Sequence, residues 1–268
     1  MKQMTRNFVA AGALLVIVIA SGCTDKINYL KARSSLNSGV KSFEAADFPR
    51  AVDHFSRAIE LDPALMDART YRACAYMMQY VPGGESEDNE RVAEQAIAGF
   101  QEVLSQDPGN ALAQEYIASL YYNMKEFDKA KEAYTQLLAT NPDHKIAHYT
   151  IGVIDWAQTY EPRLEVRAGL GMRPDDPGPI KDKKAREELA AKNLPLVEEG
   201  LQHLQKAVAI DPQYDDAMVY INLLYREQAD VSETKEEFEK LNAMAEDWVQ
   251  KALDSKKLKA DAGTKEAF

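Results

Sequence analysis

Cysteine is almost missing from this sequence. Its 268 residues contain two cysteines, Cys23 and Cys74. If Cys23 is chemically modified, for the reason given below, no internal disulfide can form and packing alone must stabilise the fold. A chain of this length with 46% hydrophobic residues can bury a substantial core.

Basic residues are also scarce. The 43 aspartates and glutamates outnumber the 32 lysines and arginines, which gives a formal net charge of −11. Affinity for nucleic acid comes mainly from basic side chains that neutralise phosphates. The charge balance therefore argues against a nucleic-acid partner, and otherwise it bears only on solubility and on the charge of partners.

Motifs for catalysis and metal binding are absent as well. The histidines His54, His144, His148 and His203 are scattered, and the pair at 144 and 148 has neither an HExxH motif nor a cysteine partner. The glycine-containing stretch AGLGMRPDDPG follows no predicted strand, and no serine-centred elbow occurs. We therefore predict a non-catalytic protein with no catalytic residue, no metal site and no cofactor.

Long runs of valine and isoleucine, which would indicate buried strands, are few beyond residue 22. Alanine, glutamate, lysine and leucine are abundant instead. This composition is typical of helical proteins. We expect the chain beyond residue 22 to be nearly all helical.

The longest apolar stretch lies close to the N-terminus. Lys2 and Arg6 precede it, and small residues end it just before Cys23. This is the pattern of a signal peptide, and the stretch is shorter than the roughly 20 apolar residues that span a bilayer. The sequence Ala-Ser-Gly-Cys at 20–23 resembles the lipobox of bacterial lipoproteins, although alanine stands where leucine is usual.

The lipobox resemblance implies a signal peptide over 1–22, a lipidated Cys23 and a short linker over 23–31. An ordinary secretory signal or an uncleaved anchor is the alternative. Removing 1–22 takes the net charge to −13, because two basic residues and no acid are lost. Thr24 stands where an aspartate would retain a Gram-negative lipoprotein in the inner membrane. We expect a cell-envelope protein that faces the periplasm, at the outer membrane if the host is Gram-negative.

Internal repeats organise the rest of the chain. Residues 39–63, GVKSFEAADFPRAVDHFSRAIELDP, and residues 118–142, ASLYYNMKEFDKAKEAYTQLLATNP, share an alanine four residues before an aromatic ring and a closing proline. A small residue beside a large one on the same helical face lets the paired helix approach closely. Pro142 follows Pro108 by 34 residues. These features resemble the tetratricopeptide repeat, a helix–turn–helix unit with this period.

The resemblance implies an all-α solenoid, a right-handed superhelix of about five such repeats over 32–255. We place the repeats at about 32–65, 66–110, 111–144, 145–214 and 215–255. Asp-Pro or Asn-Pro pairs close the first four, because proline cannot continue the preceding helix. The last residues, 256–268, are predicted to be a disordered polar tail.

Three repeats are longer than the period, so we predict insertions at about 81–90, 161–193 and 227–236. All three are placed between the two helices of a repeat and should project from one edge of the solenoid. We expect removal of residues 163–180 to leave the fold nearly intact. Long loops are often functional, and the longest insertion offers three basic candidates for partner contacts: Arg163, Arg167 and Arg173.

In tetratricopeptide solenoids the first helix of each repeat lines the concave groove. The groove candidates are Tyr71, Met77, Tyr116, Tyr122, Tyr149, Val153, Trp156 and Tyr220. About half of them could instead belong to the core, with Tyr149 and Trp156 the better candidates. The basic and amide residues of the carboxylate clamp in chaperone-binding relatives are not found. An aromatic groove suits a partner helix or an extended peptide.

The functional prediction is a lipid-anchored envelope scaffold. Such a scaffold would bind envelope proteins through the aromatic groove and support assembly of an envelope or secretion complex. The alternative is a polysaccharide-export scaffold that binds glycan or an export porin. Glycan is a suitable ligand because sugar rings also stack on aromatic side chains. The short linker would hold the solenoid within roughly 25 Å of the bilayer.

Overall fold

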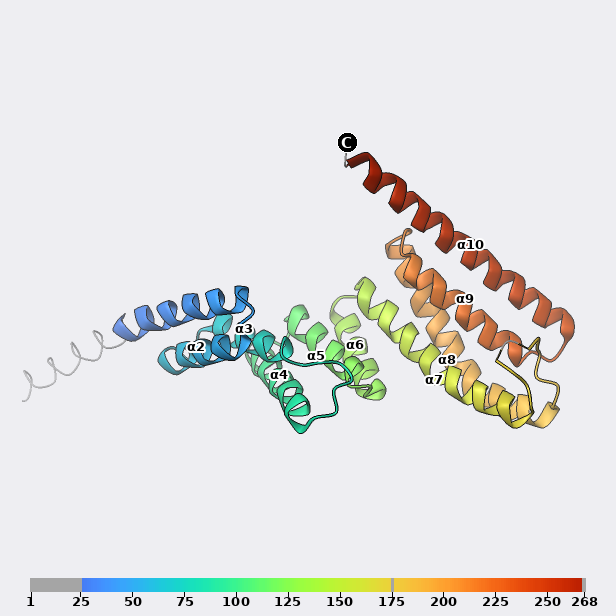
Figure 1. Ribbon diagram of the computed structural model, residues 1–268, viewed down its shortest axis with the longest axis horizontal. Coiled ribbons are helices and arrows are strands. Elements are labelled where there is room, and N and C mark those ends of the chain that lie inside the picture. The colour runs from blue at the N-terminus through green and yellow to red at the C-terminus, as the bar shows by residue number, and fades with distance from the viewer. Residues whose placement is uncertain (1–25, 175, 267–268) are drawn as a thin grey trace, which may run out of the picture. The chain divides into compact units, whose positions relative to one another are not determined.

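The computed structural model describes residues 26–174 and 176–266, so the predicted signal peptide and Cys23 lie outside the described residues. Within these ranges the chain is helical and contains no strand (Figure 1). None of the described helices combines the length and hydrophobicity that crossing a bilayer requires. The chain divides into two compact units, Met1–Lys125 (unit 1) and Glu126–Phe268 (unit 2), which are described separately.

Unit 1 contains a helix over residues 26–44 followed by four further helices. These are α2 (Phe48–Leu61), α3 (Met66–Met77), α4 (Glu87–Gln106) and α5 (Ala111–Asn123). Side-chain caps fix where several of them begin, because Asp47, Ser86 and Asn110 accept hydrogen bonds from free N–H groups of the first turns of α2, α4 and α5. Successive helices from α2 to α5 pack against one another.

The core of unit 1 shows why small and aromatic residues alternate in its sequence. Phe55, on α2, is fully buried against the helix over 26–44. A Cβ added to Gly39 would lie 2.5 Å from the Phe55 ring, so only glycine allows this approach. Gly99 serves α4 in the same way, since a Cβ there would lie 2.9 Å from the Cβ of Ala73 on α3.

Unit 2 is built from longer helices. It contains α6 (Phe127–Thr140), α7 (Lys145–Gly169), α8 (Lys183–Ile210), α9 (Asp215–Asp230) and α10 (Lys235–Glu266). α7 packs against α6, α8 and α9, and α9 packs also against α8 and α10. Leu204, Ile221 and Leu224 are fully buried at the centre of this packing.

The segment over 161–193 does not project from the helices as the sequence analysis expects. α7 continues through Pro162 to Gly169, and α8 begins at Lys183 and passes without a break through Pro195. The loop between them is held against the core, because Ile180 is fully buried and its N–H donates to the carbonyl of Asp230. Tertiary packing here outweighs the tendency of proline to end a helix.

Three other boundaries also need correction. α4 begins at Glu87 and α9 runs to Asp230, so the connecting segments are 78–86 and 231–234, not 81–90 and 227–236. The helix that contains residues 26–31 occupies most of the predicted linker.

The predicted polar tail is not disordered over residues 256–266, because α10 continues to Glu266. Its later turns contact the start of α9. Ser255 Oγ donates to the carbonyl of Gln213, and Lys259 pairs with Asp215. The stretch is rich in alanine and lysine and lacks proline, which favours a helix once one face has partners.

Candidate functional site

The groove candidates of unit 1 are partly core residues. The Tyr71 ring stacks on Phe55 at a centroid distance of 5.5 Å, although 40% of Tyr71 is exposed. Tyr116 lies against Phe100 at 5.2 Å. Met77 packs into the same cluster as Tyr116, and Tyr122 is partly buried. These four side chains are therefore partly packed within unit 1 and expose only part of their apolar surface.

Cys74 lies among these residues on α3. Burial raises the pKa of its thiol to about 11, so the thiol is protonated at neutral pH. A thiol is a poor nucleophile in its protonated form. This side chain therefore contributes packing and no reactivity.

The groove candidates of unit 2 come together in one row, with the exception of Val153. Val153 is buried with 4% exposed, so it belongs to the core and cannot contact a partner. Tyr149 and Trp156, on α7, both contact Tyr220 on α9, with ring centroids 5.8 and 5.2 Å apart. The row, which we call the aromatic row, consists of Tyr214, Tyr149, Tyr220, Trp156 and Tyr160.

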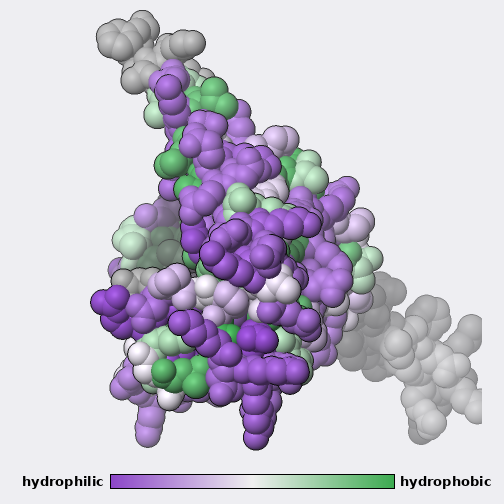
Figure 2. All heavy atoms as spheres, turned by 90° about the vertical axis from the view of Figure 1, so that its right-hand side faces the viewer, coloured by the Kyte–Doolittle hydropathy of each residue, from purple (hydrophilic) through white to green (hydrophobic). Residues whose placement is uncertain are grey.

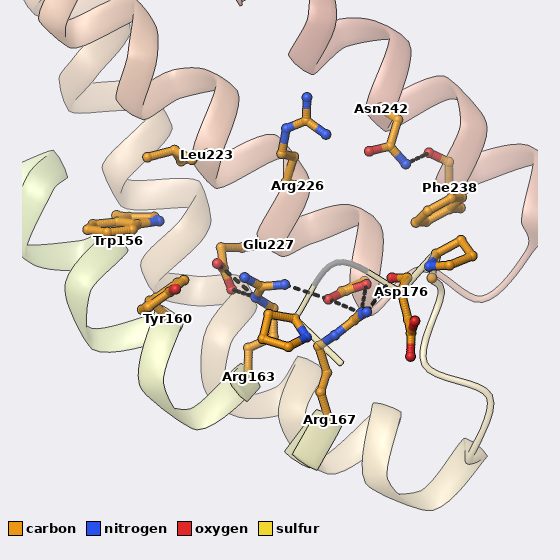
Figure 3. A pocket seen from close by; sticks show the side chains of 14 residues that line it. Trp156, Tyr160, Arg163, Arg167, Asp176, Leu223, Arg226, Glu227, Phe238 and Asn242 are labelled. Carbon is orange, nitrogen blue, oxygen red and sulfur yellow. Dashed lines mark hydrogen bonds and ion pairs between the residues drawn. The ribbon is translucent and has the colours of Figure 1, made fainter. Parts of the chain in front are cut away.

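A pocket of about 260 Å³ lies at the Trp156 end of the aromatic row (Figure 3). α7 contributes Trp156, Tyr160, Arg163 and Arg167, which recur at intervals of three or four residues and so share one helical face. The other walls come from the loop after α7, from α9 and from α10. They include Pro174, Pro177, Leu223, Arg226, Glu227, Asp230, Phe238 and Asn242.

An ion-pair network forms one wall of the pocket. Arg163 Nε donates to Glu227 Oε1 at 2.9 Å, and its Nη1 donates to Asp230 Oδ2 at 2.9 Å. Arg167 is 1% exposed, and its Nη1 donates to both carboxylate oxygens of Asp230 at 2.7 and 2.8 Å. Buried charges need such partners, because an uncompensated one costs several kcal/mol.

The three arginines proposed as partner contacts therefore have intramolecular roles. Arg167 Nη2 donates to the carbonyls of Arg173 and Asp176 and so fastens the loop after α7 to the helix. Arg173 alone is exposed, and it pairs with Asp176 at 2.9 Å. Arg163 and Arg167 are thus bound to acids of α9, and of the three candidates Arg173 has the exposed side chain.

Glu227 is the most perturbed acid of the pocket. Burial raises its pKa to about 7, the neighbouring Asp230 adds to the increase, and Arg163 and Arg167 oppose it. Glu227 Oε2 has no hydrogen-bond partner, and the same holds for Trp156 Nε1. The pocket thus contains one indole N–H without a partner and one carboxylate oxygen that has an ion pair with Arg163 but no hydrogen bond, and both atoms are shielded from solvent.

Sequence reasoning also missed a histidine pair on α7 and α8. His148 Nδ1 and His203 Nδ1 lie 2.9 Å apart, and His148 Nε2 lies 3.0 Å from the carbonyl of Pro142. Since a carbonyl only accepts, His148 Nε2–H donates to Pro142, and one of the two Nδ1 atoms donates to the other. His144 caps α7 by accepting from Ala147 N–H. In the described part of the chain no group of three or more His, Cys, Asp or Glu could hold a metal ion.

A second buried ion pair joins α6, α7 and α8. Asp155 is fully buried, and Lys131 Nζ contacts its Oδ1 at 2.7 Å and Glu199 Oε2 at 2.8 Å. Burial raises the pKa of Asp155 to about 6, and Lys131 opposes this increase. Asp155 lies inside the helix packing and Lys131 and Glu199 are partly exposed beside it, so we assign this cluster a structural role.

A sequence profile of the tetratricopeptide repeat matches residues 92–151. Among solved structures, a MamA protein covers 86% of this chain and 94% of its own at 16% identity, with a TM-score of 0.57. The structure of MamA from residue 41 to the end, from Desulfovibrio magneticus RS-1, covers 85% of this chain and 96% of its own at 14% identity, with a TM-score of 0.56.

YrrB, titled a TPR protein with an unusual peptide-binding site, covers 83% of this chain and 90% of its own at 15% identity, with a TM-score of 0.50. No curated protein sequence matches the chain. The profile and the solved structures agree with the helix pairs described above. The chain therefore has the tetratricopeptide-repeat solenoid fold, as the sequence predicts.

Proposed function

We propose that this protein is a non-catalytic scaffold that binds a segment of a partner protein. The aromatic row and the adjoining pocket of unit 2 form the binding site. Cys23, when lipidated, holds the scaffold at a membrane of the cell envelope, at the outer membrane if the host is Gram-negative, where it supports assembly of an envelope or secretion complex.

The aromatic row is the observation that carries the proposal. Five rings from α7, α9 and the turn before α9 lie within 6 Å of their neighbours. Partly buried Tyr and Trp give large contact area with little loss of conformational entropy, and they dominate the binding energy of protein interfaces. On the face shown in Figure 2, hydrophilic residues predominate and hydrophobic ones form small separate patches. This face therefore offers no broad apolar surface.

The fold supports a peptide as the ligand. YrrB, which has this fold, is described as binding peptide. A partner segment lying along α7 and α9 would meet ring faces first and the pocket at the end of the row. Peptides that lie in a groove commonly bind in this way, with one anchor side chain placed in a deeper pocket.

The charge distribution of the helix over 26–44 supports a membrane-proximal position. Lys26, Lys31, Arg33 and Lys41 occur there with no acid before Glu44, in a chain that is otherwise strongly acidic. Ile27 and Leu30 are 51% and 66% exposed. Apolar side chains with basic neighbours favour the headgroup region of an anionic bilayer, and each basic residue contributes about 1 kcal/mol.

The proposal is tested by photo-crosslinking in the cells of origin. A photoreactive residue replaces Tyr149 or Tyr160 in the row, and Lys184 serves as control because its side chain is 87% exposed on α8. We expect one discrete protein adduct from the two row positions and none from position 184. Absence of any protein adduct from the row, or an identical pattern from position 184, would contradict the proposal.

A glycan-binding export scaffold is the alternative. The Trp156 and Tyr160 rings line the same pocket as Arg226 and Asn242, and sites that combine aromatic rings with polar groups also suit sugars. The same experiment separates the two functions. Capture of no protein, together with binding of purified cell-surface glycan to the full chain, would favour the alternative.

A further inference from the structure

Two buried polar atoms of the pocket have no hydrogen-bond partner: Trp156 Nε1 and Glu227 Oε2. Glu227 is 3% exposed. Its Oε2 lies 2.9 Å from Arg163 Nε, but the N–H of Arg163 is directed to Oε1. Figure 3 shows the indole edge that carries the nitrogen turned toward the interior of the pocket.

Unsatisfied buried polar atoms are costly, at about 1–3 kcal/mol each, and native proteins contain few of them. A ligand that forms hydrogen bonds with both atoms would recover this free energy at Trp156 Nε1 and part of it at Glu227 Oε2, which already has an ion pair with Arg163. Such a ligand must accept a hydrogen bond from the indole and donate one to the carboxylate. This requirement defines the chemistry of the occupant.

The pocket's charged groups already have partners of opposite sign. Arg163 and Arg167 pair with acids of α9, and Arg226 Nη2 contacts Glu246 Oε1 at 2.5 Å. A carboxylate entering the pocket would meet Glu227, and an ammonium group would meet the guanidinium groups. Neither would find an unpaired counter-charge, so the arrangement favours a neutral polar group.

We propose that the pocket holds the primary amide of an asparagine or glutamine side chain. This inference rests on the proposed function, because the side chain belongs to the partner segment that lies along the aromatic row. The amide oxygen accepts from Trp156 Nε1–H, and the amide nitrogen donates to Glu227 Oε2. The Tyr160, Leu223 and Phe238 side chains cover the methylene groups.

The size of the pocket agrees with this occupant. The cavity of about 260 Å³ lies just below the roughly 300 to 1,000 Å³ of sites for drug-sized molecules, so it has room for a long side chain together with part of the partner's backbone. A sugar ring would bring several hydroxyl groups into a site with only two unmet partners, and the others would be buried without hydrogen bonds.

The tryptophan side chains provide a direct experiment. The sequence contains two tryptophans, so the full chain labelled with 15N-tryptophan gives two indole N–H signals in NMR spectra. Trp248, on α10, does not line the pocket and serves as an internal control. The titrations are run at pH 8, where Glu227 is ionised.

The probes are the N-acetyl methylamides of glutamine, glutamate and lysine, and methyl N-acetylglucosaminide. The first three share the same backbone amides. The glutamine and glutamate side chains differ only in their terminal group, and the lysine side chain presents an ammonium group on a longer chain. A probe of this size should bind with a Kd of about 1 mM. We expect the glutamine probe to move the Trp156 signal, with binding at least about ten-fold tighter than for the charged probes. The Trp248 signal should stay in place.

A matched pair of variants tests the acceptor. Glu227→Gln replaces the carboxylate by a group of the same shape and should weaken binding of the glutamine probe about ten-fold. Asp143→Asn, at an exposed acid outside the pocket, should not change it. The unchanged Trp248 signal and the dispersion of the spectrum show that each variant is folded.

Several results would overturn the amide assignment. They are equal binding of the charged probes, a response to the glucosaminide alone, no response to any probe, or unchanged binding by Glu227→Gln. The proposed function has a separate readout in the cross-linking experiment. Amide binding without a cross-linked protein would contradict the scaffold, whereas a cross-linked protein without amide binding would contradict only the ligand chemistry.

Discussion

The surroundings of Glu227 in unit 2 disfavour the ionised form of its carboxyl group. Glu227 lies in the pocket with a pKa of about 7, well above its ordinary value of 4.5, mainly because burial penalises the charged form. A carboxylate in such a position reduces the stability of the fold when it ionises. Its position beside an indole N–H without a hydrogen-bond partner fits a role in binding, because the ionised carboxylate does not stabilise the fold.

The pH dependence of stability follows from this pKa. The folded chain binds the Glu227 proton more tightly than the unfolded chain, so the contribution of Glu227 to stability falls as pH rises from 4.5 to 7. The loss is on the order of 2–3 kcal/mol. Relative to the wild type, Glu227→Gln should therefore gain stability between pH 4.5 and 8. Urea unfolding at both pH values measures the difference, and a constant difference would contradict the pKa assignment.

The hydrogen-bond and ion-pair partners of individual side chains could not be found from the sequence. His148 pairs with His203, which is 55 residues away in the chain, although His144 has the helical spacing that attracts notice. The acids that bind Arg163 and Arg167 are likewise more than 60 residues distant. Pattern reasoning named Tyr149, Trp156 and Tyr220 as groove candidates, and their rings lie in contact in the structure, but it could not tell that Val153 is buried.

At the scale of helices, the spacing of small residues and Asp-Pro or Asn-Pro pairs was informative because these residues act locally. Asp62, Asp107, Asn141 and Asp211 are the C-cap residues of α2, α4, α6 and α8. Helix length was harder to predict. Excess residues in a repeat can lengthen its helices or form a loop, and only tertiary contacts decide between these outcomes. α7 and α8 took up most of the excess.

The loop after α7 should depend on one buried guanidinium group. Arg167→Ala leaves Asp230 with one partner fewer and frees the carbonyls of the loop, so we expect a loss of about 3–5 kcal/mol. Arg173→Ala removes an exposed pair and should cost under about 1 kcal/mol. Denaturant unfolding compares the two variants. Similar losses of stability in the two variants would show that the Arg167 hydrogen bonds do not hold the loop after α7 in place.

The close packing of α7 on α8 makes a second prediction at this scale. A Cβ at Gly152 would lie 2.4 Å from Leu204 Cγ, so Gly152→Ala should destabilise the protein by about 1–3 kcal/mol through overpacking. Gly169, near the end of the same helix, has open space around it, and Gly169→Ala should be neutral or slightly stabilising. Melting curves of the pair test the packing, and equal Tm values would contradict it.

At the scale of the whole molecule, the proposal joins a partner-binding unit to a membrane anchor. The anchor can be tested independently of the partner. Cells supplied with a labelled fatty acid should incorporate label into the wild type and into Cys74→Ser, but not into Cys23→Ser. Label in the Cys23→Ser variant, or no label in the wild type, would contradict lipid anchoring at Cys23. Neither result would bear on the proposed binding site.

The central claim is that the aromatic row and its pocket bind the partner. Its most direct test is the affinity of the cross-linked protein for the purified chain, measured by titration calorimetry with the wild type, Trp156→Ala and Trp248→Ala. Both tryptophans pack against the core of unit 2, so the pair controls for lost packing. An interface hot spot contributes about 2 kcal/mol or more, so Trp156→Ala should weaken binding about 30-fold while Trp248→Ala retains the wild-type affinity. Unchanged binding by a folded Trp156→Ala variant would contradict the account.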